Sequence, residues 1–169
     1  MDEKLTHILG GRLSRDHLAS FIIDNPDKFD EIVNVAVSNK RPYCWRAAWM
    51  INLTISKNDK RIHKHILKII KSIDDKEDGH QRELLKIIDR LNIKEDHEGY
   101  LFDACVSIWK SVHKSSSVRI TAFRIISDII IKYPELKNEI RPLTQAHYTD
   151  TLSPGIKNTF NRLILKATF

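Results

Sequence analysis

The sequence has few of the residues that interrupt regular structure. Only five glycines and five prolines occur in 169 residues, so few long loops are expected. The strict apolar–polar alternation of half-buried strands is absent. Ile129, Ile130 and Ile131 have high strand propensity, but they close an apolar stripe with helical spacing that begins at Val118. Together, these features predict an all-α protein.

Cysteine and long apolar runs are also scarce. Cys44 and Cys105 stand far apart in apolar helical segments, which predicts buried free thiols rather than a disulfide. No stretch approaches the roughly 20 apolar residues that a membrane-spanning helix needs. The opening residues do not show the pattern of a signal peptide. We therefore expect a cytoplasmic protein that does not bind membranes and forms a single domain over residues 1–169.

Motifs for catalysis and for cofactor binding are missing. Gly10-Gly11 is not followed by the Lys-Ser/Thr of a phosphate-binding loop. His63 and His65 point to different faces of a helix, and no cysteine or carboxylate completes a metal-binding set. The serines at 115–117 are explained by helix capping. We expect no catalytic residue, no metal and no cofactor.

Apolar spacing and the positions of proline divide the chain into helices that follow one another in pairs. Pro26, Pro42 and Ser153-Pro154 each open a helix, and Tyr133-Pro134 ends one. A helix that starts near residue 135 meets Pro142, where a kink or a break is expected. The other predicted helices cover about residues 14–24, 28–38, 43–56, 59–73, 81–91, 95–112, 115–131 and 153 to the end.

One local pattern recurs along these helices at a spacing of 36 to 38 residues. Arg46, Arg82, Arg119 and Lys157 are each followed three residues later by an apolar residue. The residue six positions on is also apolar in three of the four cases, with Asn52 as the exception. A period of this length, carried by helices, is typical of a solenoid in which each hairpin buries its apolar face against its neighbours.

Two segments resemble the HEAT repeat. SVRITAFRIISDIIIKYPELKNEI has a Val-Arg pair, an alanine three residues later and a proline opening the second helix, and YCWRAAWMINLTISKNDKRI is similar. The resemblance implies a right-handed α-α superhelix, HEAT- or armadillo-like, of about four helical hairpins plus a terminal helix. It also implies that the recurring cation reaches an acidic group of the neighbouring hairpin, although a row of four cations facing a phosphate backbone is an alternative. HEAT-like arrays serve chiefly as binding scaffolds, so the fold does not specify a function.

Charge is concentrated in particular segments. Residues 1–40, 41–73, 74–103 and 104–169 carry net charges of −2, +7, −5 and +6. In the predicted helix 59–73, isoleucines form one side and cations the other, and the resemblance places this second helix of its hairpin on a concave wall. We refer to these cationic residues as the basic row: Lys60, Arg61, Lys64, His65, Lys68 and Lys71.

A basic row suits an acidic partner, although it is also explained as the solvated face of an amphipathic helix. The acidic partner could be a protein or a nucleic acid, and the sequence contains no sequence-specific reader for either. Trp45 is the tryptophan most expected to be exposed and to add contact area, whereas Trp49 and Trp109 are expected in the core. We predict a non-enzymatic binding or scaffold module, a monomer or weak homodimer, that captures an acidic protein, with nucleic-acid binding as the alternative.

An enzymatic interpretation also rests on resemblance. The alkylpurine DNA glycosylases built from HEAT-like repeats are small, basic and all-α, and they use Trp, Asp and Arg side chains. In this chain Trp45 and Trp49 flank Arg46, and Asp103 or Asp128 would supply a carboxylate. No position-by-position match to that constellation exists, so no residue is assigned a catalytic role.

Overall fold

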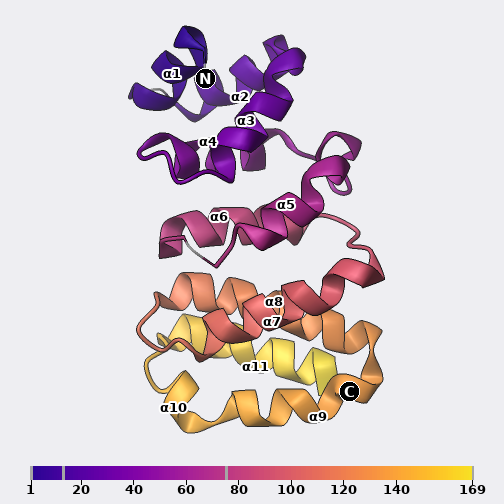
Figure 1. Cartoon of the computed structure of the whole chain (residues 1–169). Coiled ribbons are helices and arrows are strands. Elements are labelled where there is room, and N and C mark those ends of the chain that lie inside the picture. Colours follow the sequence, from indigo (N-terminus) through magenta and orange to yellow (C-terminus); the bar gives the residue numbers. More distant parts are fainter. Residues whose placement is uncertain (1, 13, 75, 169) are drawn as a thin grey trace. The chain divides into compact units, whose positions relative to one another are not determined.

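The computed structural model describes residues 2–12, 14–74 and 76–168, and within these residues it contains helices and no strand (Figure 1). The chain forms two compact units, residues 1–93 and 94–169, and each is considered by itself. No helix in the described ranges is long and apolar enough to cross a bilayer. The prediction of an all-α fold is confirmed.

The first unit contains most of the helices that the sequence predicts. α2 and α4 match the predicted ranges closely, and Ser14 caps α2 by accepting a hydrogen bond from the backbone of His17. α1 was not predicted, although Leu5 and Leu9 on it are fully buried. The elements are α1 (Glu3–Gly10), α2 (Arg15–Asp24), η1 (Pro26–Lys28), α3 (Phe29–Ala36), α4 (Tyr43–Thr54), η2 (Lys60–His65), α5 (Ile66–Lys71) and α6 (Asp78–Ile88).

α4 is the central helix of this unit. α1, α2, α3 and α6 all pack on it, and Figure 1 shows it beside α3. Its buried residues include Ala47, Ala48, Met50 and Ile51, which have no exposed surface. Cys44 on the same helix is a buried free thiol, as is Cys105 in the second unit, so the prediction for both cysteines is confirmed. α4 thus holds its neighbours at close range through ordinary apolar packing.

The predicted helix 59–73 has a different form. Asp59 caps it as expected, but residues 60–65 form the 3-10 helix η2 and only residues 66–71 form the α-helix α5. Like charges four residues apart disfavour α-helical geometry, and Lys60, Lys64 and Lys68 create two such pairs. A 3-10 turn is tolerated over short stretches, so the basic sequence is accommodated in that form.

The second unit is organised around α8. α7 and α11 pack on it, and α8 ends at Lys132 before Pro134, as predicted. The segment around Pro142 is broken into four short helices, which confirms the expected break. The elements are α7 (Glu95–Lys110), α8 (Ser116–Lys132), η3 (Pro134–Leu136), α9 (Lys137–Ile140), η4 (Arg141–Thr144), α10 (Ala146–Thr149) and α11 (Pro154–Thr168).

An aromatic cluster and a buried guanidinium hold this unit together. The rings of Trp109, Phe123 and Phe160 lie 4.5 to 5.1 Å apart, centroid to centroid, and Trp109 has no exposed surface. The Trp109 indole N–H donates to the Leu143 carbonyl at 2.8 Å, which ties the irregular segment to the core. The expectation of a core position is therefore confirmed for Trp109.

Among the described residues, Arg119 bonds to no acidic group of a neighbouring hairpin, so that expectation is wrong at this position. Its fully buried guanidinium donates to the carbonyls of Trp109 and Tyr148 and to the hydroxyl of Thr151. Its carbon also lies 4.9 Å from the centre of the Trp109 ring. Burial lowers the pKa of Arg119. Neutral oxygens take the place of the expected carboxylate because the guanidinium lies at the C-terminal ends of two helices, where backbone carbonyls lack helical partners.

Candidate functional site

Part of the basic row is bonded to α3, the second helix of the preceding hairpin. Asp30 on α3 accepts from Lys64 Nζ and lies 2.8 Å from His65 Nε2. These contacts hold the pKa of Asp30 below its ordinary value, with Lys64 as the larger cause. One turn further along α3, Asn34 accepts from Lys68 Nζ at 2.6 Å. The row therefore lies alongside the polar face of α3.

Arg61 is also committed to a contact within the unit. Its guanidinium donates twice to the Asp59 carboxylate, at 2.7 and 3.1 Å, and lies 4.5 Å from the centre of the Phe29 ring. The Arg61 hydrogen bonds lower the pKa of Asp59. The guanidinium thus supports the turn that begins η2, and replacing it would disturb that turn.

The other lysines of the row are not neutralised by a described carboxylate, although Lys68 bonds to the neutral Asn34. Lys60, Lys68 and Lys71 are exposed, and within the described parts of the chain none of them has an acidic partner. Lys60, Arg61 and Lys64 line one hollow of about 500 Å³ together with Asp27, Phe29 and Asp30. The structure therefore brings the first half of the row together, but beside two carboxylates that partly neutralise it.

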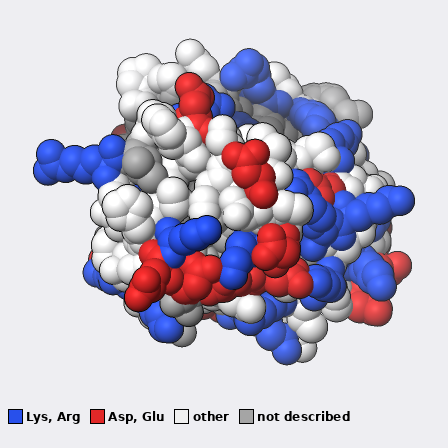
Figure 2. All heavy atoms as spheres, turned by 90° about the horizontal axis from the view of Figure 1, so that it is seen from above, with Lys and Arg blue, Asp and Glu red and all other residues white. Residues whose placement is uncertain are grey.

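The polar contacts between neighbouring hairpins recur at the repeat spacing. Asp30 and Lys64 are 34 residues apart, Arg41 and Glu77 are 36 apart, and in the second unit Lys132 bonds to Glu98, 34 residues earlier. Cations of one hairpin thus meet acceptors of the adjacent one. On the face drawn in Figure 2, basic and acidic side chains lie next to one another. The alternating segment charges found in the sequence therefore help to join neighbouring hairpins.

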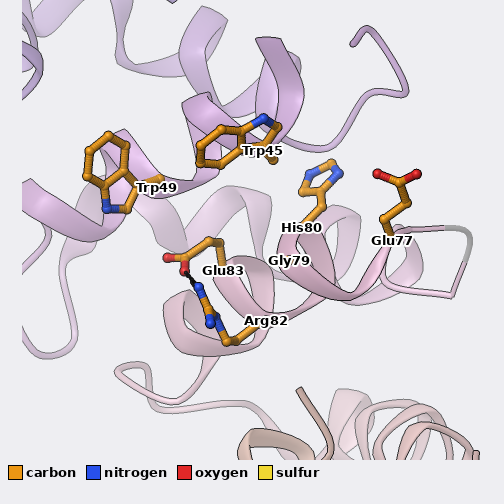
Figure 3. A pocket seen from close by; sticks show the side chains of 7 residues that line it. All are labelled: Trp45, Trp49, Glu77, Gly79, His80, Arg82 and Glu83. Atoms are coloured by element: carbon orange, nitrogen blue, oxygen red, sulfur yellow. Dashed lines mark hydrogen bonds and ion pairs between the residues drawn. The ribbon is translucent and has the colours of Figure 1, made fainter. Parts of the chain in front are cut away.

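Trp45 lies in a different hollow from the basic row. It is 45% exposed, which confirms the prediction for this residue, and its ring lies 6.3 Å from that of Trp49, at an angle of 26°. The two indoles form one side of a pocket of about 500 Å³ between α4 and α6, which we call the tryptophan pocket (Figure 3). Trp49 is half-buried there, whereas the sequence placed it in the core. The other lining residues are Glu77, Gly79, His80, Arg82 and Glu83.

Glu83 anchors the tryptophan pocket from below. It is 3% exposed and accepts from Arg82 at 3.2 Å and from Lys86 at 2.9 Å (Figure 3 shows the Arg82 contact). The side-chain amide of Asn52 on α4 donates to two acceptors of Glu83, the carboxylate and the backbone carbonyl. Arg82 therefore bonds to a carboxylate of its own helix, not to one of a neighbouring hairpin. The Glu83 carboxylate is saturated with donors and links α4 to α6.

A smaller hollow of about 170 Å³ adjoins the tryptophan pocket, with Trp45, Glu77 and His80 lining both. We call it the lysine pocket, because Lys76 lines it and is only 9% exposed. The Lys76 ammonium bonds to the side-chain carbonyl of Asn39, a neutral acceptor. The Arg41–Glu77 ion pair, at 2.7 Å, lies at its edge and is largely exposed.

His80 separates the two pockets. Its Nε2 lies 2.6 Å from the Ala36 carbonyl oxygen, so this nitrogen carries the proton and donates. Burial is the main cause of a lowered pKa for His80, and the nearby charges of Lys76 and Arg41 act in the same direction. The imidazole is therefore neutral at pH 7, and its Nδ1 is left as an acceptor.

Comparison with known proteins agrees with this architecture. A family model described as the HEAT repeat domain matches residues 1–168. The chain belongs to the HEAT repeat domain family. No curated protein and no solved structure shows significant similarity to it. HEAT repeat domains commonly act as scaffolds for protein interactions, so the family supports a binding role without indicating the partner.

Sequence reasoning missed most residues of the two pockets in this HEAT repeat unit. It singled out Trp45 and the recurring Arg82, but not Lys76, His80 or Glu83. One signal was present, because Asn52 interrupts the apolar pattern and is the residue that bonds to Glu83. A polar residue at a buried repeat position indicates a polar partner on the adjacent hairpin.

Proposed function

We propose that this HEAT repeat chain is a protein-binding module that captures an acidic segment of a partner along the basic row and catalyses no reaction. The observation that carries the proposal is the set of exposed lysines Lys60, Lys68 and Lys71, which have no acidic partner among the described residues. Exposed cations of this kind attract an acidic segment over a distance of about 10 Å at 0.1 M salt. The association is expected to be fast and sensitive to salt.

The absence of catalysis is proposed from the state of Glu83. A glycosylase-type site needs a carboxylate that converges with an aromatic ring beside a cation, and the tryptophan pocket holds all three groups. However, Glu83 is buried and receives hydrogen bonds from Arg82, Lys86 and Asn52, so it is poorly placed to stabilise a developing positive charge on a substrate. The Asp128 carboxylate accepts a hydrogen bond from Lys166 at 2.8 Å. A base-release assay on alkylated DNA is expected to show no activity.

The test is fluorescence anisotropy with a labelled polyglutamate peptide at about 50 and 200 mM salt. Binding should weaken as salt rises, and a variant with Lys60→Glu, Lys68→Glu and Lys71→Glu should bind at least about tenfold more weakly. Arg61 and Lys64 are left unchanged because they hold Asp59 and Asp30. A matched control with Lys94→Glu, Lys110→Glu and Arg162→Glu makes the same charge change on exposed residues of the second unit. If both variants lose binding equally, the net charge and not the row is responsible.

Nucleic acid is the alternative partner, and the same experiment separates it from protein. Labelled duplex and single-stranded DNA and RNA are titrated in parallel under both salt conditions. The row would be identified as a phosphate-binding surface if a nucleic acid bound more tightly than polyglutamate. Its affinity would also have to fall steeply with salt and in the variant with glutamate at positions 60, 68 and 71. Weak or absent nucleic-acid binding at low salt is the expected result.

A further inference from the structure

The lysine pocket contains a buried ammonium that bonds to a neutral acceptor, and this indicates the charge of its ligand. A buried ammonium is costly unless an anion or several strong acceptors compensate it. Lys76 is 9% exposed, and its partner in the described part of the chain is the neutral amide oxygen of Asn39. The neighbouring acid, Glu77, is paired with Arg41 and points largely to solvent, with 67% of its side chain exposed. The pocket therefore has a positive charge that an incoming carboxylate would balance.

The tryptophan pocket offers a complementary surface directly beside it. Its Trp45 and Trp49 rings stack with their centroids 6.3 Å apart, and Trp45 is exposed in a position to be covered by a ligand. Gly79 has open space around the position of a side chain, so nothing fills this side of the pocket from within. Large apolar or aromatic side chains that cover exposed indoles contribute strongly to binding.

The local charges also favour an acidic ligand over a basic one. Glu83 is shared by two cations, Arg82 and Lys86, so this group has a net positive charge. The residues that line the two pockets carry three positive charges, on Arg41, Lys76 and Arg82, and two negative charges, on Glu77 and Glu83. His80 lines both pockets, and its Nδ1, which bonds to no residue in the described parts of the chain, is an acceptor.

We propose that the two adjoining pockets bind a short peptide segment of a partner protein, with a carboxylate side chain at Lys76 and a bulky apolar side chain against Trp45 and Trp49. This inference rests on the proposed protein-binding function, but it assigns a site distinct from the basic row. The row attracts acidic segments in general, whereas the paired pockets select an acidic residue close to an aromatic or large aliphatic one.

The experiment is an NMR titration of the ¹⁵N-labelled chain that follows the three tryptophan indole N–H signals. The probe is a short capped peptide with one phenylalanine between glutamates. The signals of Trp45 and Trp49 should shift, while that of Trp109 should not, because its indole is buried and bonded to Leu143 in the other unit. Trp109 thus serves as an internal reference.

Matched peptides and variants test each part of the site. Replacing phenylalanine by serine in the peptide, or Trp45→Ala in the protein, should weaken binding by at least about tenfold. Replacing the glutamates by glutamines should weaken the response of the Trp45 and Trp49 indoles in the wild type, but in the Lys76→Met variant both peptides should shift these indoles at the same concentration. This variant keeps the length of the side chain and removes a buried charge whose partner among the described residues is neutral, so it is expected to fold.

The same spectra distinguish failure of the inference from failure of the proposed function. Shifts of the backbone amides of residues 60–71 without any shift of the Trp45 and Trp49 indoles would overturn the inference and leave the row as the binding site. No shift at either place would overturn both. A lysine-containing peptide that binds as well as the glutamate peptide, or a single-stranded oligonucleotide that shifts the indoles at lower concentration, would also overturn the inference.

Discussion

At the scale of single residues, side chains of the same kind in this HEAT repeat chain have different roles because they bond to different partners. Arg61, Arg82 and Arg119 are all arginines beside apolar helical residues, yet they bond to a capping carboxylate, a carboxylate of the same helix and backbone carbonyls, respectively. Only Arg119 is fully buried. The resemblance to HEAT repeats placed a cation at this position, but the acceptor depends on which helix ends lie nearby.

His80 makes the stability of the first unit depend on pH. Burial lowers its pKa in the folded chain below the unfolded value of 6.5, so the unfolded chain binds the proton more readily. The free energy of unfolding should therefore be highest above pH 6.5 and should fall as the pH drops through 6.5 toward the folded pKa. The His80→Gln variant should lose less stability than the wild type between pH 7.5 and 5.5, measured as the thermal midpoint.

A suitable control for this pH effect is His113→Gln, because His113 is exposed and lies in the second unit. This variant should show the pH dependence of the wild type. An equal change in the pH dependence of both variants would show that the effect does not arise at His80.

At the scale of elements, the contact between α4 and α6 combines apolar packing with one buried polar link. Asn52 on α4 donates to Glu83 on α6, and both side chains are at least 94% buried. This contact fixes the register of the two helices, because sliding either helix would separate the buried Asn52 amide from its acceptors on Glu83. The link also fixes the distance between the indoles and the residues that face them.

Removing this link should be more damaging than removing an exposed ion pair of similar spacing. Glu83→Ala should lower the free energy of unfolding by about 2 kcal/mol, because a buried hydrogen bond from Asn52 to a charged carboxylate is lost together with the contacts of Arg82 and Lys86. Glu77→Ala removes the exposed pair with Arg41 and should cost less than about 1 kcal/mol. Urea denaturation followed by circular dichroism compares the two variants. Equal losses would argue against a structural role for the Asn52–Glu83 contact.

At the scale of the whole molecule, opposite charges on adjacent hairpins oppose the effect of the net charge. The chain carries +6, which favours repulsion, yet the contacts at the repeat spacing pair cations with anions. Both effects weaken as salt screens them, but they change stability in opposite directions. The sign of the salt dependence therefore shows which effect dominates.

We expect the attraction between hairpins to dominate. The free energy of unfolding should fall by about 1 kcal/mol between about 50 and 500 mM sodium chloride, because several partly exposed pairs each contribute a few tenths of a kcal/mol. Chloride is used instead of sulfate, since sulfate strengthens apolar burial and would mask the effect. A rise in stability with salt would show that repulsion from the net charge dominates.

Features set by interactions between residues close in the sequence were predictable, whereas features set by contacts between distant residues were not. Helix ranges such as 14–24 and 43–56, the end before Pro134, the break at Pro142 and the buried thiols were predictable, because propensity, capping and apolar spacing are local properties. The exposed position of Trp45 was also predictable, whereas α1 and the 3-10 form of η2 were not. A short helix and a 3-10 segment depend on packing against other elements, which no local pattern records.

The sequence by itself determined that this chain is a basic, all-α HEAT repeat protein with charges concentrated hairpin by hairpin. Only the tertiary structure decided which cations of the basic row have an acidic partner, because Lys64 bonds to Asp30 on α3, 34 residues away, whereas Lys68 bonds there to the neutral Asn34. It also decided that Trp45 faces Lys76 and Glu83 and not the basic row. The sequence contains the period of the repeat. The contacts between successive repeats depend on how their helices are rotated against one another, and this rotation is fixed by packing.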